Sequence, residues 1–350
     1  MNSVSSILII RPSAIGDVVM ASPMIKVLRE AYPEARLVWL AEPQVRELLE
    51  ANPALDQVIL WSKAQWRQLL RKGRLFTLAR EMWRFARALR RERFDLALDA
   101  QGLLRSRLLA WLSGARERIG FASREPGRFL MSRIVSKGPE SKHMSSEYRH
   151  LMTELGLHPG AFAPSIATAL KDRQTAQDLN REIGAEFVVF APFTTRPQKH
   201  WFEERWAELA RKIDERFGLP VVILGGPGDA EAGRRIRERA AGKISDFCGK
   251  TTIGQAAALV ERSTLVIGVD TGLTHLGTAF ERPTIALFGA TCPYLQTASS
   301  KTRVLYEKQP CSPCRRNPVC NGEFPCMARH SVESVLAAAE SFLIAERVSP

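Results

Sequence analysis

The sequence predicts an α/β protein with two similar halves, each a parallel sheet joined by crossover helices. Short apolar runs rich in Val, Ile and Leu alternate with helical segments along the whole chain. The first run, residues 7–10, ends in a turn of small residues that leads into a helix, as in nucleotide-binding α/β units. A length of 350 residues and a hydrophobic content of 45% are enough for two domains of ordinary size.

The first half contains five predicted strands. They lie at residues 7–10, 37–41, 58–61, 94–100 and 116–120. One helix is expected to begin at Gly16. Further helices are expected at residues 43–50, at residues 62–93, in a segment that contains Arg105, and at residues 144–155. A stretch with Gly and two Pro at residues 158–164 precedes the next polar helix, so we place the domain boundary near residue 170.

The second half repeats this alternation. Its predicted strands lie at residues 187–190, 220–224, 247–252, 265–268 and 284–288. Its predicted helices lie at residues 171–183, 206–217, 230–241, 253–262 and 331–348. Three strand ends finish in small or hydroxyl-bearing residues, which are Thr194 with Thr195, Gly225 with Gly226, and residues 270–272. Backbone N–H groups at such helix starts bind phosphate, so this half is the expected nucleotide domain.

A net charge of +13 indicates acidic partners, such as nucleic acid, a phosphorylated sugar or lipid, or an anionic membrane surface. Residues 62–93 are dense in arginine, with Trp66, Trp83 and Phe85 between the charges. This pattern is typical of a membrane-contacting helix or of a solvated helix face. Because no nucleic-acid-binding motif accompanies it, we expect no nucleic-acid partner.

We find no run of ~18 apolar residues and no signal peptide, and so expect a cytoplasmic protein.

Two charged residues are candidates for chemistry. Asp17 follows the first strand, where open α/β sheets place their ligands, although an Asp in the first helical turn can simply cap the helix. The turn before it lacks the glycines of a dinucleotide fingerprint. Lys199 lies close to two threonines and Trp201, where a compact positive charge suits a diphosphate; the alternative is an exposed lysine at a helix entry.

Four of the six cysteines cluster near the end of the chain. They are Cys311, Cys314, Cys320 and Cys326. Their spacing could supply four thiolates to a structural zinc ion. We favour reduced thiols or a disulfide-prone loop, because the surrounding loops are not those of a standard zinc ribbon.

Five motifs in order resemble the ADP-heptose:lipopolysaccharide heptosyltransferases, an inverting glycosyltransferase family. They are RPSAIGDV (11–18), DAQGLLRS (99–106), SREP (123–126), TTRPQKHW (194–201), and VDTGLTH (269–275) with the later GAT (289–291). The resemblance implies a GT-B fold, with two Rossmann-like domains facing across a cleft. Residues 1–170 would bind the acceptor, residues 171–330 the nucleotide sugar, and residues 331–350 would form a helix packed on the N-terminal domain.

The resemblance also implies roles for particular residues. Asp17 would be the general base, and Lys199 would neutralise the departing diphosphate. The implied donor-site residues are Thr194, Thr195, Lys199, Gly225, Asp270, Thr271, Gly272, Leu273 and His275, with Asp270 accepting hydrogen bonds from heptose hydroxyls. The implied acceptor-site residues are Ser13, Gly16, Arg67, Arg105 and Arg124.

The implied substrates are ADP-heptose and a Kdo-lipid A acceptor, with no cofactor and no metal. Such an enzyme would work on the anionic cytoplasmic face of the inner membrane. The SREP motif and the region of Trp66 resemble the enzyme that adds the first heptose, whereas the cysteine tail is closer to the enzyme that adds the second. We favour the first. A nucleotide-sugar epimerase and a non-enzymatic binder of nucleic acid or membrane are the rival interpretations.

Overall fold

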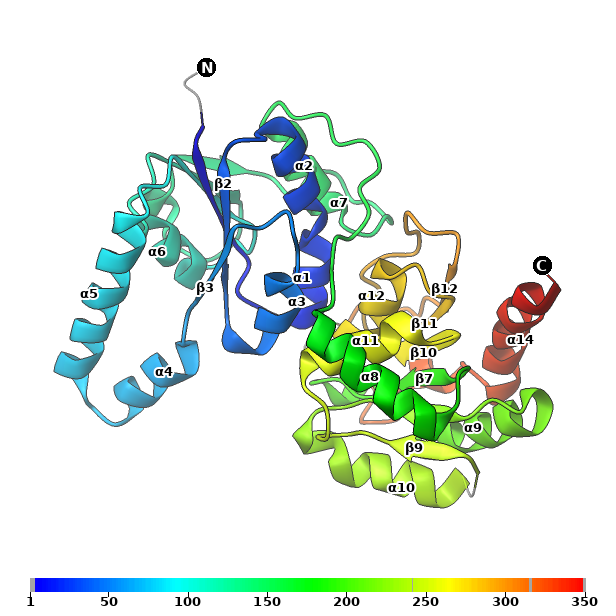
Figure 1. The fold of residues 1–350 in the computed structure, drawn as a ribbon. Coiled ribbons are helices and arrows are strands. Elements are labelled where there is room, and N and C mark those ends of the chain that lie inside the picture. The colour runs from blue at the N-terminus through cyan, green and yellow to red at the C-terminus, as the bar shows by residue number, and fades with distance from the viewer. Residues whose placement is uncertain (1–3, 241, 315–316, 349–350) are drawn as a thin grey trace. The chain divides into compact units, whose positions relative to one another are not determined.

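The computed structural model describes residues 4–240, 242–314 and 317–348. It divides into two compact units (Figure 1), of which the first is Met1–Glu140 with Ser145–Ala167, and the second is Ser141–Met144 with Thr168–Pro350. We call them unit 1 and unit 2. Their division at residues 167 and 168 lies close to the boundary expected near residue 170.

Unit 1 contains a six-stranded parallel sheet with the order β3-β2-β1-β4-β5-β6. The strands are β1 (Ser6–Ile10), β2 (Arg36–Ala41), β3 (Gln57–Leu60), β4 (Leu96–Asp99), β5 (Glu117–Phe121) and β6 (Arg133–Val135). The helices are α1 (Ile15–Ala21), α2 (Pro23–Ala31), α3 (Arg46–Glu50), α4 (Lys63–Arg71), α5 (Leu75–Arg91), α6 (Leu104–Leu112) and α7 (Ser146–Glu154). Short 3-10 helices lie at Pro43–Val45 and Arg128–Leu130.

Strand β1 lies at the centre of this sheet and is buried along its whole length. Ile7 and Ile9 belong to the apolar core on one face, and Leu8 and Ile10 to the core on the other face. Because successive side chains of a strand point to opposite faces, a strand covered on both sides has to be continuously apolar.

Unit 2 repeats the architecture with the order β12-β11-β10-β7-β8-β9, again all parallel. The strands are β7 (Val188–Ala191), β8 (Val221–Ile223), β9 (Ile244–Asp246), β10 (Leu265–Val269), β11 (Thr284–Phe288) and β12 (Thr302–Tyr306). The helices are α8 (Leu170–Ile183), α9 (Glu203–Phe217), α10 (Ala230–Ala240), α11 (Ile253–Arg262), α12 (Gly272–Ala279), α13 (Pro325–Ala328) and α14 (Val332–Val348). Short 3-10 helices lie at Pro197–Lys199 and Pro227–Asp229.

In each unit the strand order reverses beside the central strand, between β1 and β4 in unit 1 and between β7 and β10 in unit 2. Ligands of open α/β sheets bind at the carboxyl ends of the strands at this switch point. The topology therefore directs the search for a site to four short connections, those that follow β1, β4, β7 and β10.

Several details differ from the sequence prediction. Residues 247–252, predicted as a strand and turn, form only turns, and the strand precedes them as β9. The end of the helix predicted at 230–241 lies outside the described residues at position 241. The long helix predicted at 62–93 is divided into α4 and α5 at Gly73, whose φ of +65° favours glycine.

Helix α14 packs on α9 and on strands β10 and β11, and its residues Val335 and Ala339 are buried in the core of unit 2. The prediction that residues 331–350 pack on the N-terminal domain differs from these contacts, which lie within unit 2. In the described part of the chain, no helix is long and apolar enough to cross a membrane.

Candidate active site

Asp17 lies in α1, which follows the carboxyl end of β1 in unit 1. Its Oδ2 is 2.6 Å from Nη2 of Arg11, the first residue after the strand, and accepts a hydrogen bond of 3.3 Å from the backbone N–H of Ala14. The second contact is the capping role that the sequence allowed. The ion pair is an addition that the sequence analysis did not foresee.

The two side chains of this pair differ in exposure. The Arg11 side chain is 9% exposed and the Asp17 side chain 41%. Burial lowers the pKa of Arg11, but Tyr148, Asp17 and other neighbouring groups outweigh it and raise that pKa, so the guanidinium is a permanent cation. Among the described residues, Oδ1 of Asp17 has no hydrogen-bond partner, because both contacts use Oδ2. Arg11 therefore holds the carboxylate while one oxygen stays available.

Ser13 and Gly16, which the resemblance assigns to the acceptor site, lie close to Asp17 in the same segment; their contact with an acceptor stays a prediction. Ser13 Oγ donates to Glu42 Oε1 over 2.7 Å, and Lys63 Nζ donates to the same oxygen over 3.1 Å. Burial raises the pKa of Glu42, but hydrogen bonds from Gln44, Ser13 and Lys63 outweigh it and lower that pKa. Gly16 is the second residue of helix α1, which begins one residue earlier than predicted, at Ile15.

The three arginines predicted to hold the acceptor have exposed side chains and, within the described residues, no ion-pair partner; they are Arg67, Arg105 and Arg124. Arg105 lies on α6 and Arg124 on the loop after β5. That loop is tied to α6, since Leu104 donates its backbone N–H to Glu125 over 2.7 Å. The structure thus brings the segments of Arg105 and Arg124 together, whereas Arg67 lies on α4.

Arg107 is a residue whose role the sequence analysis missed. It is fully buried, and its guanidinium donates to the carbonyls of Phe121, Glu125 and Pro126 and to Ser123 Oγ, over 2.7–3.1 Å. Arg107 therefore shapes the loop that presents Arg124. The signal available in the sequence was its i, i+2 spacing from Arg105, which puts the two arginines on different faces of one helix.

Lys199 and Asp270 form the centre of the candidate site in unit 2. Lys199 Nζ lies 2.5 Å from Asp270 Oδ2, with side chains only 15% and 12% exposed. Lys199 follows β7 and Asp270 follows β10, which are neighbours at the switch point. The alternative of an exposed lysine is therefore wrong, because Lys199 is largely buried and paired.

Two further side chains contact the carboxylate of Asp270. Thr291 Oγ1 also donates to Oδ2, and His275 Nε2 lies 3.3 Å from Oδ1. Burial raises the pKa of Asp270, but His275 and Lys199 outweigh it and hold the pKa well below its usual range. The other ring nitrogen of His275 lies 2.8 Å from the hydroxyl of Tyr294, a buried residue that the sequence analysis did not single out.

The remaining predicted donor residues surround this centre. Thr271, Gly272 and Leu273 form the start of α12, where backbone N–H groups lack intrahelical partners. Gly225 has a packing reason to be glycine, since a Cβ there would lie 2.7 Å from Phe193 and 3.0 Å from the Cys248 sulfur. Its contact with the donor stays a prediction.

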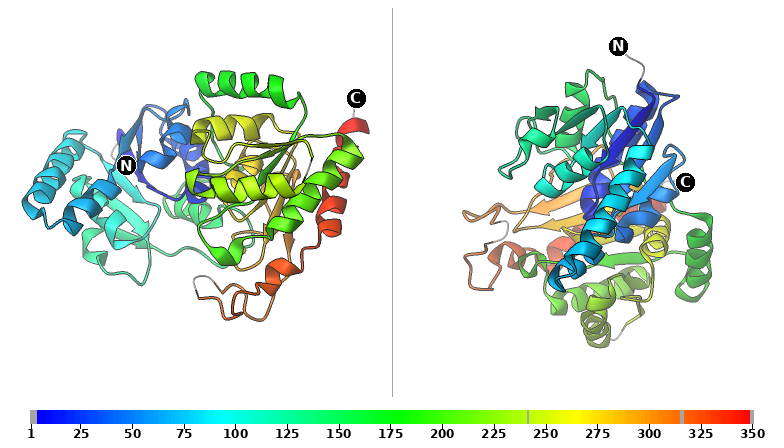
Figure 2. Two further views of the ribbon diagram at one scale, coloured as in Figure 1. Left: turned by 90° about the horizontal axis from the view of Figure 1, so that it is seen from below. Right: turned by 90° about the vertical axis from the view of Figure 1, so that its left-hand side faces the viewer.

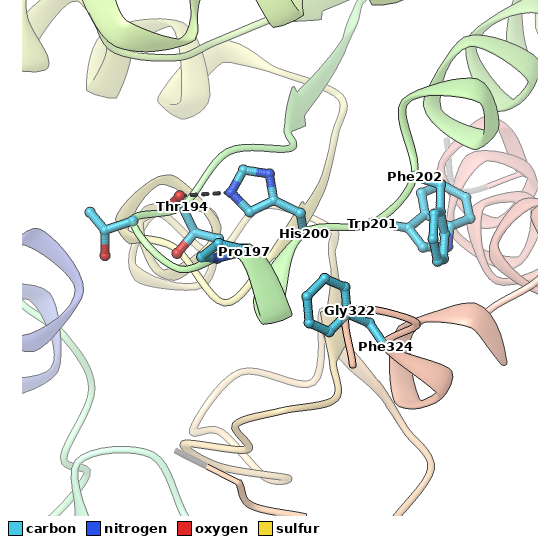
Figure 3. A pocket seen from close by; sticks show the side chains of 8 residues that line it. Thr194, Pro197, His200, Trp201, Phe202, Gly322 and Phe324 are labelled. Carbon is cyan, nitrogen blue, oxygen red and sulfur yellow. Dashed lines mark hydrogen bonds between the residues drawn. The ribbon is translucent and has the colours of Figure 1, made fainter. Parts of the chain in front are cut away.

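A pocket of about 470 Å³ adjoins the two predicted threonines (Figure 3). It is lined by Thr194, Thr195, Pro197, His200, Trp201, Phe202, Gly322 and Phe324. His200 Nε2 lies 2.7 Å from the carbonyl oxygen of Thr194, which fixes the ring against the loop after β7. The cysteine-containing segment thus forms one wall of this pocket through Phe324.

The cysteines of that segment are all free thiols in the structure. Burial raises the pKa of Cys314 and of Cys326, which disfavours the thiolate form. In the described residues, no three His, Cys, Asp or Glu side chains are grouped as a metal site would require. Cys326 has a packing role, because it lies against Gly289 at the end of β11.

The family model of glycosyltransferase family 9 (heptosyltransferase) matches residues 82–323. The chain belongs to this family. It is 31% identical over 317 residues to lipopolysaccharide heptosyltransferase 1 of Pseudomonas aeruginosa, which covers 88% of this chain and 85% of that relative. It is 26% identical to lipopolysaccharide heptosyltransferase 2 of Escherichia coli, over 85% of this chain and 87% of that one.

Solved structures of this family have the same fold. The family 9 glycosyltransferase of Veillonella parvula matches with a TM-score of 0.83 and 23% identity over 97% of both chains. The E. coli heptosyltransferase WaaC with ADP-2-deoxy-2-fluoro heptose matches with a TM-score of 0.72 and 24% identity, over 96% of this chain and 99% of that one. As a member of family 9, this chain is a glycosyltransferase. Its two Rossmann-like α/β units confirm the predicted GT-B fold class.

Proposed function

We propose that this protein transfers L-glycero-D-manno-heptose from ADP-heptose to the Kdo-lipid A inner core of lipopolysaccharide, as a heptosyltransferase I. The observation that carries the proposal is Asp17, a half-exposed carboxylate with one unoccupied oxygen at the switch point of unit 1. Membership of family 9 and the relatives named heptosyltransferase 1 support the choice of sugar and acceptor.

In the proposed reaction, a hydroxyl of the acceptor sugar loses its proton to Oδ1 of Asp17. The acceptor oxygen forms a bond to the anomeric carbon of the heptose while the bond from that carbon to the diphosphate breaks. ADP leaves with the electron pair of that bond, and direct attack inverts the anomeric centre. Arg11 acts as a positioning residue, since it fixes Oδ2 and leaves Oδ1 toward solvent.

We assign the diphosphate to Lys199 and the start of α12. An ammonium group has three hydrogens, of which one is directed to Asp270, so that two remain for phosphate oxygens. The backbone N–H groups at the start of α12 add donors without adding a side-chain charge. Thr194 and Thr195, which line the adjoining pocket, would supply hydroxyl donors. Asp270 would mainly orient Lys199, because its oxygens already accept from three side chains.

On the acceptor side we assign Arg105 and Arg124, and with them Arg67, to the carboxylates and phosphates of the inner core. Arginine pairs with such groups in a bidentate manner. A lipid-anchored acceptor places the reaction at the cytoplasmic face of the inner membrane. We propose that no metal takes part, since Lys199 supplies positive charge at the leaving group.

The deciding experiment is incubation with ADP-heptose and a defined Kdo-lipid A acceptor, followed by mass spectrometry of the product. One added heptose is the expected result, with the same rate after dialysis against EDTA. No product with either this acceptor or a heptosylated one would refute the proposal. Product only with the heptosylated acceptor would identify a heptosyltransferase II, which the relatives of that name and the cysteine segment favour as the second candidate.

A further inference from the structure

Helices α4 and α5 form a hairpin in unit 1 (Figures 1 and 2). One face of the hairpin belongs to the core. Trp66 packs edge-on against Trp61 and Phe85, and Ala86 and Leu89 are buried. These contacts anchor the hairpin to the sheet and account for only part of its apolar side chains.

The other apolar side chains of the hairpin point to solvent. Leu70 is 58% exposed, Leu75 59%, Phe76 95% and Trp83 60%. The first three lie within seven residues at the tip of the hairpin. Trp83 lies seven residues after Phe76 and thus on the same face of α5. Large exposed apolar groups that gather on one element indicate an interaction surface.

The same surface is strongly basic. Residues 62–93 contain eleven lysines and arginines and two glutamates. Within the described residues, Lys63 and Arg84 are the members of the eleven lysines and arginines that form ion pairs. The tip itself carries Arg71, Lys72 and Arg74 between its apolar residues, and the Arg87 guanidinium lies 5.2 Å from the centre of the Trp83 ring. Apolar groups surrounded by unpaired cations match the interface of an anionic bilayer, with an acyl region below a negative headgroup layer.

Two other occupants fit less well. A second copy of this hairpin would bring the same positive charge and repel the first. A nucleic acid would pair with the arginines but offer little to Leu70 and Leu75, which can neither stack on bases nor pair with phosphate.

We infer that the α4–α5 tip, Leu70 to Phe76 with Trp83, is a membrane-docking surface that inserts its apolar side chains between anionic phospholipid headgroups. The inference builds on the proposed function, in which the acceptor is a lipid, and assigns the contact to this hairpin. Phe76 and Leu75 enter the acyl boundary, Trp83 lies at headgroup depth, and the tip cations contact lipid phosphates.

The test is co-sedimentation of the purified full chain with vesicles of phosphatidylglycerol and phosphatidylethanolamine, and with vesicles of phosphatidylcholine alone. We expect binding to the anionic vesicles, and a clear loss of it when salt rises from about 0.1 M to about 0.5 M. The triple change Leu70→Ser, Leu75→Ser and Phe76→Ser should lower the partition coefficient at least about tenfold. The matched control is Leu170→Ser on α8, also 75% exposed, which should bind like the wild type.

A second measurement reports depth. Brominated lipids quench the fluorescence of tryptophans that reach the bilayer. Of the seven tryptophans of the chain, Trp83 is the one assigned to the bilayer, so the fluorescence of the wild type should be quenched much more than that of Trp83→Phe. Vesicle binding by the triple variant equal to that of the wild type would overturn the inference, as would equal binding to neutral vesicles. So would binding of duplex DNA in place of vesicles.

Turnover with a water-soluble acceptor that lacks acyl chains separates this inference from the proposed function. The triple variant should keep wild-type turnover on that acceptor, since none of its three positions belongs to the proposed site. Loss of vesicle binding with turnover intact supports the docking surface, whereas absent turnover in the wild type would refute the enzyme assignment and leave the vesicle result standing.

Discussion

The ion pair of Lys199 and Asp270 can be tested by a double-mutant cycle. The variants are Lys199→Met, Asp270→Asn and the double variant, which have similar volumes to the wild-type side chains. Both groups are nearly buried, at 15% and 12% exposure, and lie 2.5 Å apart. When one partner of a nearly buried ion pair is removed, the other is left as an uncompensated charge. The resulting loss in the free energy of unfolding approaches the lower end of the ~3–5 kcal/mol that is typical of broken buried pairs.

Asp270→Asn should therefore lower the free energy of unfolding by about 3 kcal/mol, because Lys199 keeps its charge and loses its anion. Lys199→Met should cost less, about 2 kcal/mol, since His275 and Thr291 continue to contact the carboxylate. The double variant removes both charges and should cost no more than the larger single change. The expected coupling energy is then about 2 kcal/mol.

The assay is urea unfolding at neutral pH followed by fluorescence, with Arg211→Met and Glu215→Gln as the control cycle. That pair is 3.0 Å apart but about half exposed, so its coupling should be below ~0.5 kcal/mol. If the Lys199 and Asp270 changes were additive within about 0.5 kcal/mol, the pair would not interact in solution and the assignment of Asp270 as the residue that orients Lys199 would fail.

The pH dependence of the same comparison has a definite sign. The folded-state pKa of Asp270 lies below its usual range, so its charge stabilises the protein above the ordinary aspartate pKa of ~3.9. That contribution is lost as the pH falls through the folded-state pKa. The stability difference between wild type and Asp270→Asn should stay constant from about pH 5 to pH 8 and shrink below about pH 4.

Three further changes test the site in unit 1. Asp17→Asn should lower turnover by about two to four orders of magnitude, the range for a lost general base, while ADP affinity measured by calorimetry stays unchanged. Arg124→Ala should raise the KM for the acceptor about tenfold through a lost charge-assisted contact, and an equal rise in the KM for the donor would contradict the assignment. Arg107→Ala should lower the thermal midpoint and cost about 3 kcal/mol, because it leaves buried carbonyls without donors, and Arg105→Ala, an exposed neighbour, should leave the midpoint unchanged.

The sequence predicts the central strands and the edge strand β3 well, and the other three edge strands poorly. The runs at residues 7–10 and 265–268 are covered by helices on both faces, so burial forces them to be apolar and visible. Strand β6 has three residues and β12 is half-buried with Thr and Arg, and neither stands out from a loop. Edge strands lack a neighbour on one side, and their composition is correspondingly less constrained.

Individual site residues could be predicted from the sequence because they follow strands. The side chains that they pair with could not be predicted. Lys199 and Asp270 are 71 positions apart, and only the adjacency of β7 and β10 brings them together. The pairing of His275 with Tyr294 depends on the turn after β11 in the same way. Arg11 is adjacent in sequence to the motif that contains Asp17, but whether its side chain turns back to that carboxylate is decided by the local backbone.

Each unit places a carboxylate beside a cation at its own switch point, and burial separates the chemistry of the two pairs. At the switch point of unit 2, Asp270 is 12% exposed and both of its oxygens already accept contacts, so binding a further proton there would disrupt three interactions. At the switch point of unit 1 the cation is the buried member and the carboxylate the exposed one, with contacts to a single oxygen. A proton acceptor needs a free lone pair that substrate can reach. Of these two carboxylates, Asp17 meets that requirement and Asp270 does not.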